Sequence, residues 1–321
     1  MRFIQLMILL AATALLCVPA MAAADGPPLN IGHRGTGSNG LGNPFPENTI
    51  PSFEQAFAEG ADMIELDVTL SFDGQVVVIH DDTLDRTTDC SGCVDALTLE
   101  QIQLCDAAVG TPLEGSGVTV PTLYEVFDAI GDLGLVNVEI KSGSCSGIPA
   151  ADLAAAVDQV LGDVDAPAGT IISCFSAGVL SQMELLDPEH FTGLLFNELD
   201  NGPSIEQAHD LGFDAVHPFH LTLNADQVTW AHSMDLSVNP WTIDDRLRME
   251  ALFGMDVDGI ITDAPDLLAA AIDDWPWPPA DDDDDDDDID DDDDIDDDDA
   301  GDDDDAPVGD DDDDDDSGCC G

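Results

Sequence analysis

Glu65 and Asp67 occupy alternate positions in a stretch of the sequence that repeats with a period of two. This period is typical of a β-strand, in which alternate side chains share a face. The other face of the predicted strand is apolar and consists of Ile64, Leu66, Val68 and Leu70. Apolar packing gives no reason for two carboxylates side by side, whereas binding of a divalent cation by oxygen ligands does. The pattern therefore predicts a metal site on this strand.

The same stretch brings a histidine toward the two acids. Asp73-Gly74 is typical of a two-residue hairpin turn, because glycine tolerates the positive φ that such a turn requires. We expect Phe72 to pair with Gln75, and this register places His80 opposite Asp67. Opposed side chains share a face, with Cβ atoms about 5 Å apart. The hairpin therefore predicts a proton-transfer group beside the cation site.

Two more strand ends carry polar side chains. Residues 136–141 are predicted as a strand that places Glu139 and Lys141 on one face, and His33 and Arg34 directly follow a short apolar strand. Basic residues are scarce, since the chain has 6 lysines and arginines against 71 acids. Basic side chains that lie beside an acidic cluster in such a chain favour the binding of an anion.

Together these residues predict a chemistry. Glu65, Asp67 and Glu139 offer three oxygen ligands, which suit one divalent cation, Ca²⁺ or Mg²⁺, better than Zn²⁺. His33 and His80 can take and give a proton near neutral pH. A cation, two imidazoles and two basic side chains suit in-line displacement at an anionic centre, and phosphate is the obvious candidate. The alternative is a metal-free network in which the arginine and the lysine neutralise the carboxylates.

The elements that must position these residues alternate between strand and helix. Strands are predicted around Ile31, Ile64 and Val138 and at 170–175, 192–196, 215–218, 236–241 and 259–262. Eight strands that alternate with helices predict an α/β fold, a (β/α)8 TIM barrel, with a small insertion after the second strand at about residues 83–121. In that fold the chemistry occurs at the C-terminal ends of the strands, where the polar residues fall.

The N-terminal segment, residues 1–24, has the layout of a signal peptide, with Arg2, an apolar run through Val18 and small residues near its end. We expect a mature chain without a transmembrane segment that is secreted, periplasmic or at the cell surface. A membrane anchor is disfavoured, because the apolar run is too short to cross a bilayer. Lipidation of Cys17 is a further alternative, but bulky residues precede it.

An acidic tail, residues 276–321, follows the predicted barrel at residues 25–275. The tail holds 28 aspartates between Asp281 and Asp316 and should be disordered, because it has almost no apolar side chains to bury. The formal net charge of −65 argues against nucleic acid as a partner. The terminal Cys319-Cys320 pair suggests attachment to the cell surface or crosslinking.

The predicted barrel contains five cysteines, and export makes disulfides reasonable among them. They are Cys90, Cys93, Cys105, Cys145 and Cys174. Cys90-Ser-Gly-Cys93 has the spacing of half a zinc site, but no second pair of ligands accompanies it in the barrel. We expect a structural bridge from Cys90 or Cys93 to Cys105.

A series of short motifs occurs in order between Asn30 and Ile272. They are His33-Arg34-Gly35, Pro46-Glu47-Asn48-Thr49, Glu65-Leu66-Asp67-Val68, Asp73-Gly74, Val78-Ile79-His80-Asp81, Arg86-Thr87-Thr88, Pro121-Thr122-Leu123, Glu139-Ile140-Lys141, Trp241-Thr242 and Gly259-Ile260-Ile261-Thr262-Asp263-Ala264-Pro265. In order and spacing, this series resembles the glycerophosphodiester phosphodiesterase family.

The resemblance implies a TIM barrel with an insertion after the second strand, and a set of site residues. The implied residues are the metal ligands Glu65, Asp67 and Glu139, the acid–base pair His33 and His80, the phosphate contacts Arg34 and Lys141, Glu47 as a residue that orients them, and Trp241 and Phe175 as the wall on the glycerol side. The sequence departs from the family at Asp244, where members often carry asparagine.

The leading interpretation is a secreted, metal-dependent phosphodiesterase that hydrolyses glycerophosphodiesters to glycerol 3-phosphate and an alcohol. Phospholipase D-like action on lysophospholipids would use the same residues and differ by an apolar groove. A non-catalytic, calcium-dependent surface binding module is the alternative outside enzymes. The acidic tail and its cysteines favour that module, and the two histidines disfavour it, because a binding module needs no proton donor.

Overall fold

The computed structural model describes residues 26–40, 43–141, 143–197 and 201–277. The chain separates into two units, residues 1–280 and 281–321, and every described residue belongs to the first. The expected signal peptide, the acidic tail from residue 278 onward and the terminal cysteine pair lie outside the described residues. None of the described helices is both long enough and apolar enough to span a bilayer.

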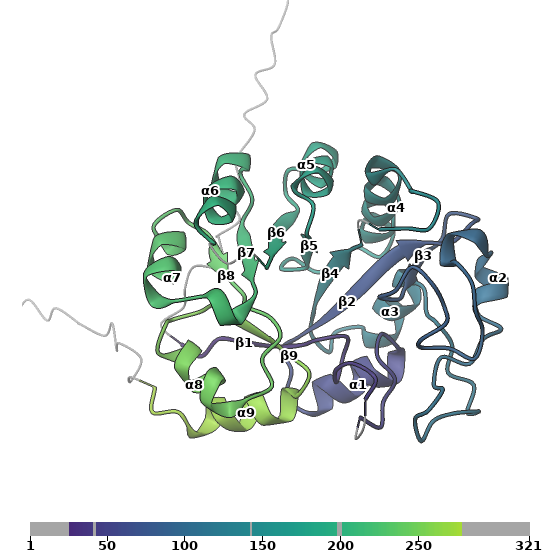
Figure 1. The fold of residues 1–321 in the computed structure, drawn as a ribbon, viewed down its shortest axis with the longest axis horizontal. Helices are drawn as coiled ribbons and strands as arrows, with labels where there is room; N and C mark the ends of the chain where they lie inside the picture. Colours follow the sequence, from purple (N-terminus) through teal and green to yellow (C-terminus); the bar gives the residue numbers. More distant parts are fainter. Residues whose placement is uncertain (1–25, 41–42, 142, 198–200, 278–321) are drawn as a thin grey trace, which may run out of the picture. The chain divides into compact units, whose positions relative to one another are not determined.

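Within the described residues, eight parallel strands form a nearly closed barrel (Figure 1). The parallel strands are β1 (Leu29–Gly32), β2 (Met63–Leu70), β4 (Leu135–Ile140), β5 (Ile171–Cys174), β6 (Phe191–Phe196), β7 (Ala215–Pro218), β8 (Ser237–Val238) and β9 (Gly259–Thr262), and β3 (Val76–Val78) is an additional strand. Their order is β8-β7-β6-β5-β4-β2-β1-β9, and β3 pairs with β2 in the antiparallel direction. The predicted α/β barrel is confirmed.

Helices follow the strands and surround the barrel (Figure 1). They are α1 (Ile50–Ala58), α2 (Leu99–Ile102), α3 (Leu123–Ile130), α4 (Ala150–Asp163), α5 (Ala177–Leu186), α6 (Gly202–Leu211), α7 (Ala225–His232), α8 (Arg246–Phe253) and α9 (Pro265–Asp274), with 3₁₀ turns η1 (Val94–Ala96) and η2 (His220–Thr222). Thr122 begins α3 with a capping box, in which its side chain accepts from the Glu125 amide and the Glu125 side chain accepts in return.

The barrel has two apolar layers. Ile64, Leu66 and Val68 of β2 belong to the main core between strands and helices, as the period of two predicted. A smaller cluster, which includes Ile31 and Met63, belongs to the opposite faces of the strands. Glu65 and Asp67 alternate along β2 with the residues that pack against the helices, and their side chains therefore face the inside of the barrel.

Strand β8 is shorter than predicted. We expected a strand at 236–241, and β8 consists of Ser237–Val238. Proline has no amide hydrogen, so the ladder cannot continue through Pro240. The barrel closes instead through single hydrogen bonds, since the amide of Asp258 donates to Val238 O at 3.0 Å and the amide of Ile261 donates to Pro240 O at 3.0 Å.

The predicted hairpin register is wrong by one residue. Leu70 pairs with Val76, so that the loop holds three residues, 72–74, rather than two. Gly74 adopts a φ of 78°, and the amide of Gly74 donates to Ser71 O. A turn followed by a left-handed glycine is the usual three-residue hairpin. Ile79 rather than His80 therefore lies opposite Asp67, and its amide donates to Asp67 O at 2.9 Å.

The segment between β3 and α3 packs as an insertion with its own apolar cluster. Leu84, Val94 and Ile102 are buried there together with Val77 and Ile79 from the hairpin. A disulfide joins Cys90 to Cys105 inside the insertion, which is one of the two alternatives that we gave for the expected bridge. The other bridge, Cys93–Cys145, was not predicted and connects the insertion to the loop after β4. Cys174 is free and buried.

Two glycine substitutions should change the stability of the barrel in opposite directions. His217 on β7 is fully buried, and a Cβ at Gly193 on the adjacent β6 would lie 2.7 Å from its Nε2. Gly193→Ala should therefore lower the free energy of unfolding by about 1–3 kcal/mol, as overpacking does. Gly162→Ala in α4 meets no atom within 4 Å. It should raise that free energy by about 0.5 kcal/mol through helix propensity. Urea unfolding measures both, and an unchanged Gly193→Ala variant would contradict the packing.

Candidate functional site

Three carboxylates from two adjacent strands meet inside the barrel. In the parallel pairing of β2 with β4, Asp67 is the partner of Glu139, and Glu65 lies one pleat earlier on the same face. One carboxylate oxygen of each residue lies within 4.8 Å of the others. Glu65 and Asp67 are buried and Glu139 is partly buried. The strand pairing thus brings together the predicted metal ligands.

Two basic side chains contact this acidic cluster. Arg34 Nε lies 3.4 Å from Asp67 Oδ2, and Lys141 Nζ lies 3.4 Å from Asp67 Oδ1. Lys141 also donates to Glu139 Oε1 at 2.7 Å. The expected alternative, in which the arginine and the lysine neutralise the carboxylates, therefore describes some of the contacts. It leaves Glu65, among the described residues, without an ion pair to an arginine or lysine side chain. Glu65 Oε2 accepts from the Arg34 amide at 3.0 Å, and Glu65 Oε1 has no hydrogen-bond partner within the described residues.

The charges of the cluster fit a divalent cation. Burial and the charge of Asp67 raise the pKa of Glu65 to about 8, and the same two causes raise the pKa of Glu139. Burial also acts on Asp67, but the charges of Lys141 and Arg34 outweigh it and lower the pKa of that carboxyl. Two of the three acids would therefore hold protons more tightly than free carboxyls do. A bound divalent cation would remove the electrostatic repulsion among the three carboxylates, and Ca²⁺ and Mg²⁺ prefer such oxygen ligands.

Asn48 fixes the orientation of Asp67. Its Nδ2 donates to Asp67 Oδ2 at 2.8 Å, and its Oδ1 accepts from the Asp67 amide at 3.2 Å. Asn48 and Arg34 both adopt a positive φ, 58° and 52°. Non-glycine residues in this conformation carry strain, which is common at functional sites. From the sequence, Asn48 was singled out only as part of the motif Pro46-Glu47-Asn48-Thr49, without a role at the site.

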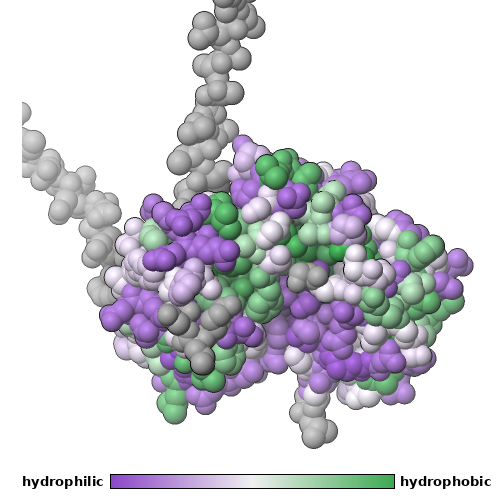
Figure 2. Space-filling model, turned by 45° about the horizontal axis from the view of Figure 1, so that its top comes forward, coloured by the Kyte–Doolittle hydropathy of each residue, from purple (hydrophilic) through white to green (hydrophobic). Residues whose placement is uncertain are grey.

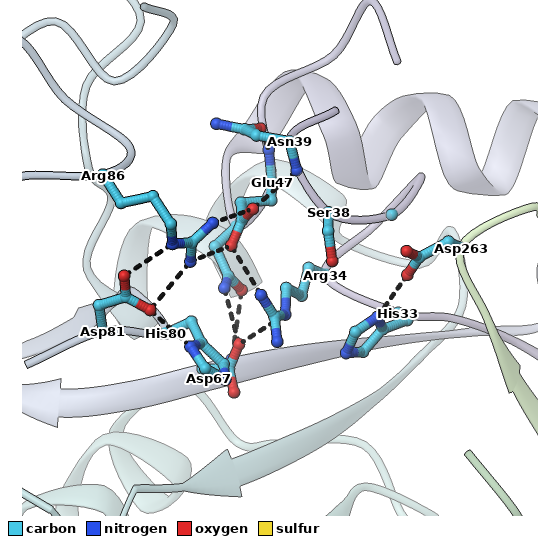
Figure 3. A network of polar contacts seen from close by, with 12 residues as sticks. His33, Arg34, Ser38, Asn39, Glu47, Asp67, His80, Asp81, Arg86 and Asp263 are labelled. Carbon is cyan, nitrogen blue, oxygen red and sulfur yellow. Dashed lines mark hydrogen bonds and ion pairs between the residues drawn. The ribbon is translucent and has the colours of Figure 1, made fainter. Parts of the chain in front are cut away.

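His33 lies at the end of β1 and is paired with an acid from the last strand. Its Nδ1 forms a hydrogen bond with Asp263 (Figure 3). Its Nε2 lies 4.0 Å from Glu65 Oε2. Burial lowers the pKa of His33, but the bond to Asp263 and the charge of Glu65 outweigh it, so the pKa is raised. Asp244 accepts from the Asp263 amide at 2.8 Å and thereby supports this pair.

His80 lies at the site, but, contrary to our prediction, it is not the residue that pairs with Asp67 in the hairpin. It follows the end of β3, and its ring lies beside Asp67 (Figure 3). Its Nδ1 forms a 2.7 Å hydrogen bond with Asp81 Oδ1. Burial lowers the pKa of His80, and the charge of Asp67 opposes that effect. Both histidines thus use Nδ1 to bond a carboxylate.

Aromatic side chains line another part of the barrel mouth. The rings of Phe175 and Trp241 are 5.5 Å apart and edge-to-face, and Trp241 also packs against Phe219. Trp241 Nε1 donates to His217 O at 2.8 Å, which fixes the indole. Phe175 is 43% exposed. Figure 2 shows that hydrophobic and hydrophilic surfaces adjoin on the face it draws. The two residues predicted as a wall are therefore neighbours.

Sequence reasoning missed the two acids that hold the histidines. Asp81 directly follows His80, and this adjacency was a usable signal. Asp263 is 230 residues from His33 in sequence. Its signal was its place directly after the last predicted strand, because β9 and β1 are neighbours in a closed barrel.

The sequence is similar to a known family of enzymes. Residues 33–267 match the sequence model of the glycerophosphoryl diester phosphodiesterase family. A glycerophosphodiester phosphodiesterase of Caldanaerobacter subterraneus subsp. tengcongensis is 37% identical over 241 residues, which cover 75% of this chain and 96% of that protein. A glycerophosphodiester phosphodiesterase of Bacillus subtilis is 32% identical over 252 residues, 74% of this chain and 84% of that one.

Solved structures share the fold. A phosphodiesterase of Oleispira antarctica, in complex with the product sn-glycerol-3-phosphate, has a TM-score of 0.69 and 28% identity, covering 77% of this chain and 97% of that chain. A glycerophosphodiester phosphodiesterase of Agrobacterium tumefaciens has a TM-score of 0.63 and 27% identity, covering 76% and 99%.

Proposed function

Because this chain belongs to the glycerophosphoryl diester phosphodiesterase family of phosphoric diester hydrolases, we propose that it hydrolyses glycerophosphodiesters to glycerol 3-phosphate and an alcohol with one divalent cation, Ca²⁺ or Mg²⁺. The observation that carries the proposal is the acidic cluster of Glu65, Asp67 and Glu139, whose oxygens lie within 4.8 Å of one another beside two histidines. The similar Oleispira antarctica structure holds sn-glycerol-3-phosphate as its product, which supports this substrate class.

The residues of the cluster would neutralise and orient the diester. A divalent cation bound by the three carboxylates would polarise the phosphoryl oxygens. Arg34 and Lys141, each 3.4 Å from Asp67, would add positive charge on the same side. Fixed charges of this kind stabilise the additional negative charge of the transition state without reorganisation.

The two histidines would transfer the protons. One protonates the leaving alcohol through its Nε2, and the other accepts a proton from the attacking group, which is water or the free glycerol hydroxyl. Attack by the glycerol hydroxyl would give a cyclic phosphate. Asp263 and Asp81 hold the two rings by Nδ1, so that each ring presents a defined nitrogen.

A lysophospholipid is the second candidate substrate, and the exposed Phe175 next to Trp241 favours it. The pair could wall the glycerol side, as predicted from the sequence, or contact part of an acyl chain.

A substrate panel tests the proposal and separates the two classes. The full chain is incubated with glycerophosphocholine, glycerophosphoethanolamine or lysophosphatidylcholine, with Ca²⁺ or Mg²⁺, and ³¹P NMR follows the products. We expect glycerol 3-phosphate or its cyclic phosphate from the first two diesters. A higher kcat/KM for lysophosphatidylcholine would assign the chain to lysolipids. No product from any diester with either cation would refute the proposal and favour the binding module.

We also propose that the protein acts outside the cytosol. Its acidic tail would attach it to the cell surface. The N-terminal segment and the two disulfides support export. Cell fractionation with N-terminal sequencing of the mature chain tests this location, and an uncleaved chain in the cytosol would contradict it.

A further inference from the structure

Arg86 belongs to the insertion, yet its guanidinium forms two paired contacts that lead into the site (Figure 3). Its Nε and Nη2 donate to the two oxygens of Asp81 at 2.7 and 2.9 Å. Its Nη1 and Nη2 donate to the two oxygens of Glu47 at 2.7 and 2.8 Å. One planar side chain thus holds two carboxylates in fixed directions, as only arginine can.

Each of these carboxylates also accepts a hydrogen bond from a residue of the site, at an oxygen that Arg86 contacts too. Asp81 Oδ1 accepts from His80 Nδ1 at 2.7 Å. Glu47 Oε1 accepts from Arg34 Nη1 at 2.9 Å. Glu47 is 3% exposed, and its Oε2 also accepts from the Asn39 amide at 2.7 Å. The hydrogen bonds therefore form a continuous path from Arg34 to His80, with Arg86 at its centre.

A purely structural ion pair does not explain this arrangement. The side chain of Arg86 is 41% exposed, so its pair with the partly exposed Asp81 contributes little to stability. Its pair with the buried Glu47 does neutralise a buried carboxylate, but that requirement alone does not explain the second pair with Asp81. Arg246 offers a comparison on the outside of the barrel, where it donates to Glu250 at 2.9 Å and to Asp274 at 3.0 Å. In the part of the chain that the structure describes, neither of those acids has a hydrogen bond or ion pair with a residue of the site. Arg86 differs from Arg246 because both of its acidic partners also bond residues of the site.

Taking the proposed function as the premise, we propose that Arg86 is a positioning residue. Arg86 orients His80 through Asp81, and it orients Arg34 through Glu47. The insertion then contributes to the reaction without touching the substrate. Its docking aligns a proton-transfer group with a phosphate-binding group. Loss of such supporting contacts typically costs tenfold to a hundredfold in activity.

A double-mutant cycle tests whether Arg86 acts through Asp81. Arg86→Gln and Asp81→Asn should each lower kcat for glycerophosphocholine by about tenfold to a hundredfold. The kcat of the double variant should be within about threefold of that of the worse single variant, because both substitutions remove the same connection from Arg86 through Asp81 to His80. Arg246→Gln is the matched control and should keep wild-type kcat. Multiplicative effects in the cycle, or wild-type kcat in Arg86→Gln, would overturn the proposal.

A second readout does not depend on turnover. Nitrogen-15 NMR of the full chain, with His80 assigned by comparison with His80→Ala, reports which ring nitrogen carries the proton when the ring is neutral. Wild type should show the Nδ1–H form, and Arg86→Gln a mixture with the Nε2–H form. An unchanged single form would overturn the role of Arg86, whereas a wild-type chain without turnover would refute only the proposed function.

Arg86→Lys covers the case in which the glutamine variant fails to fold. It keeps the charge but cannot make two parallel pairs. We expect kcat to fall by about tenfold with an unchanged far-ultraviolet circular dichroism spectrum. Wild-type kcat in a folded Arg86→Lys variant would show that charge alone suffices and would overturn the proposal.

Discussion

His80→Ala should lower kcat for glycerophosphocholine by about 10²- to 10⁴-fold, the usual contribution of a positioned proton-transfer group. The substitution removes the ring that lies beside Asp67 with its Nδ1 bound to Asp81. Thermal unfolding should change little, because the ring is only partly buried. His190→Ala is the matched control, since His190 also bonds a carboxylate, Asp158, at 2.8 Å, but at the other end of the barrel.

The same assay separates the two histidines. Glycerophospho-p-nitrophenol has a leaving group that needs no proton, whereas choline does. The histidine that protonates the leaving group should therefore matter at least tenfold less for the nitrophenyl ester. We expect this difference for one of His33→Ala and His80→Ala and not for the other. Activity within twofold of wild type in His80→Ala, with glycerophosphocholine, would contradict its catalytic role.

Asp67→Asn and Glu139→Gln should each lower kcat by about 10³-fold or more, even at saturating cation. Each substitution removes a charged ligand from a cluster in which the oxygens lie within 4.8 Å of one another. Stabilisation of transition-state charge by a bound cation contributes several kcal/mol, and each 1.36 kcal/mol corresponds to about tenfold in rate. The initial rate of glycerol 3-phosphate release measures the effect.

A buried acid elsewhere in the barrel provides the control for these variants. Glu184 on α5 is also partly buried, and burial raises its pKa. It accepts from Thr192 Oγ1 at 2.7 Å, and among the described residues no hydrogen bond or ion pair connects it to the acidic cluster. Glu184→Gln should keep wild-type kcat. If Asp67→Asn and Glu139→Gln also kept it, the cluster would be a structural network and the metal site would be refuted.

Much of the fold could be predicted because it depends on local pattern. The alternation of Ile64, Glu65, Leu66 and Asp67 indicates a strand with one polar face, whatever its neighbours are. The start of α3 depends on local sequence too, since Thr122 and Glu125 form a capping box there. Strand count then determined the barrel, since eight parallel strands close on themselves.

The errors arose where geometry depended on more than local pattern. A hairpin with Asp73-Gly74 can hold two or three loop residues, and the extra residue shifted every partner by one. His80 nevertheless lies beside Asp67, because it follows the end of β3 and is not bound to the ladder. The prediction of proximity was thus better than the prediction of register from which it came.

The site itself was predictable only in part. Glu65, Asp67 and Glu139 lie on strands that the sequence placed, so their meeting followed from strand order. Partners from distant segments could not be paired in advance. Asp263 reaches His33 only because β9 lies beside β1, and Cys93 reaches Cys145 only because the insertion packs against the loop after β4.

The dependence of wild-type turnover on added cation tests the central claim most directly. The full chain is stripped with a chelator, and hydrolysis of glycerophosphocholine is followed as Ca²⁺ or Mg²⁺ is returned. We predict that stripping abolishes turnover and that one of the two cations restores it to a saturating rate. Full-rate turnover by the stripped chain in excess chelator would contradict the claim that Glu65, Asp67 and Glu139 hold a cation that the reaction needs.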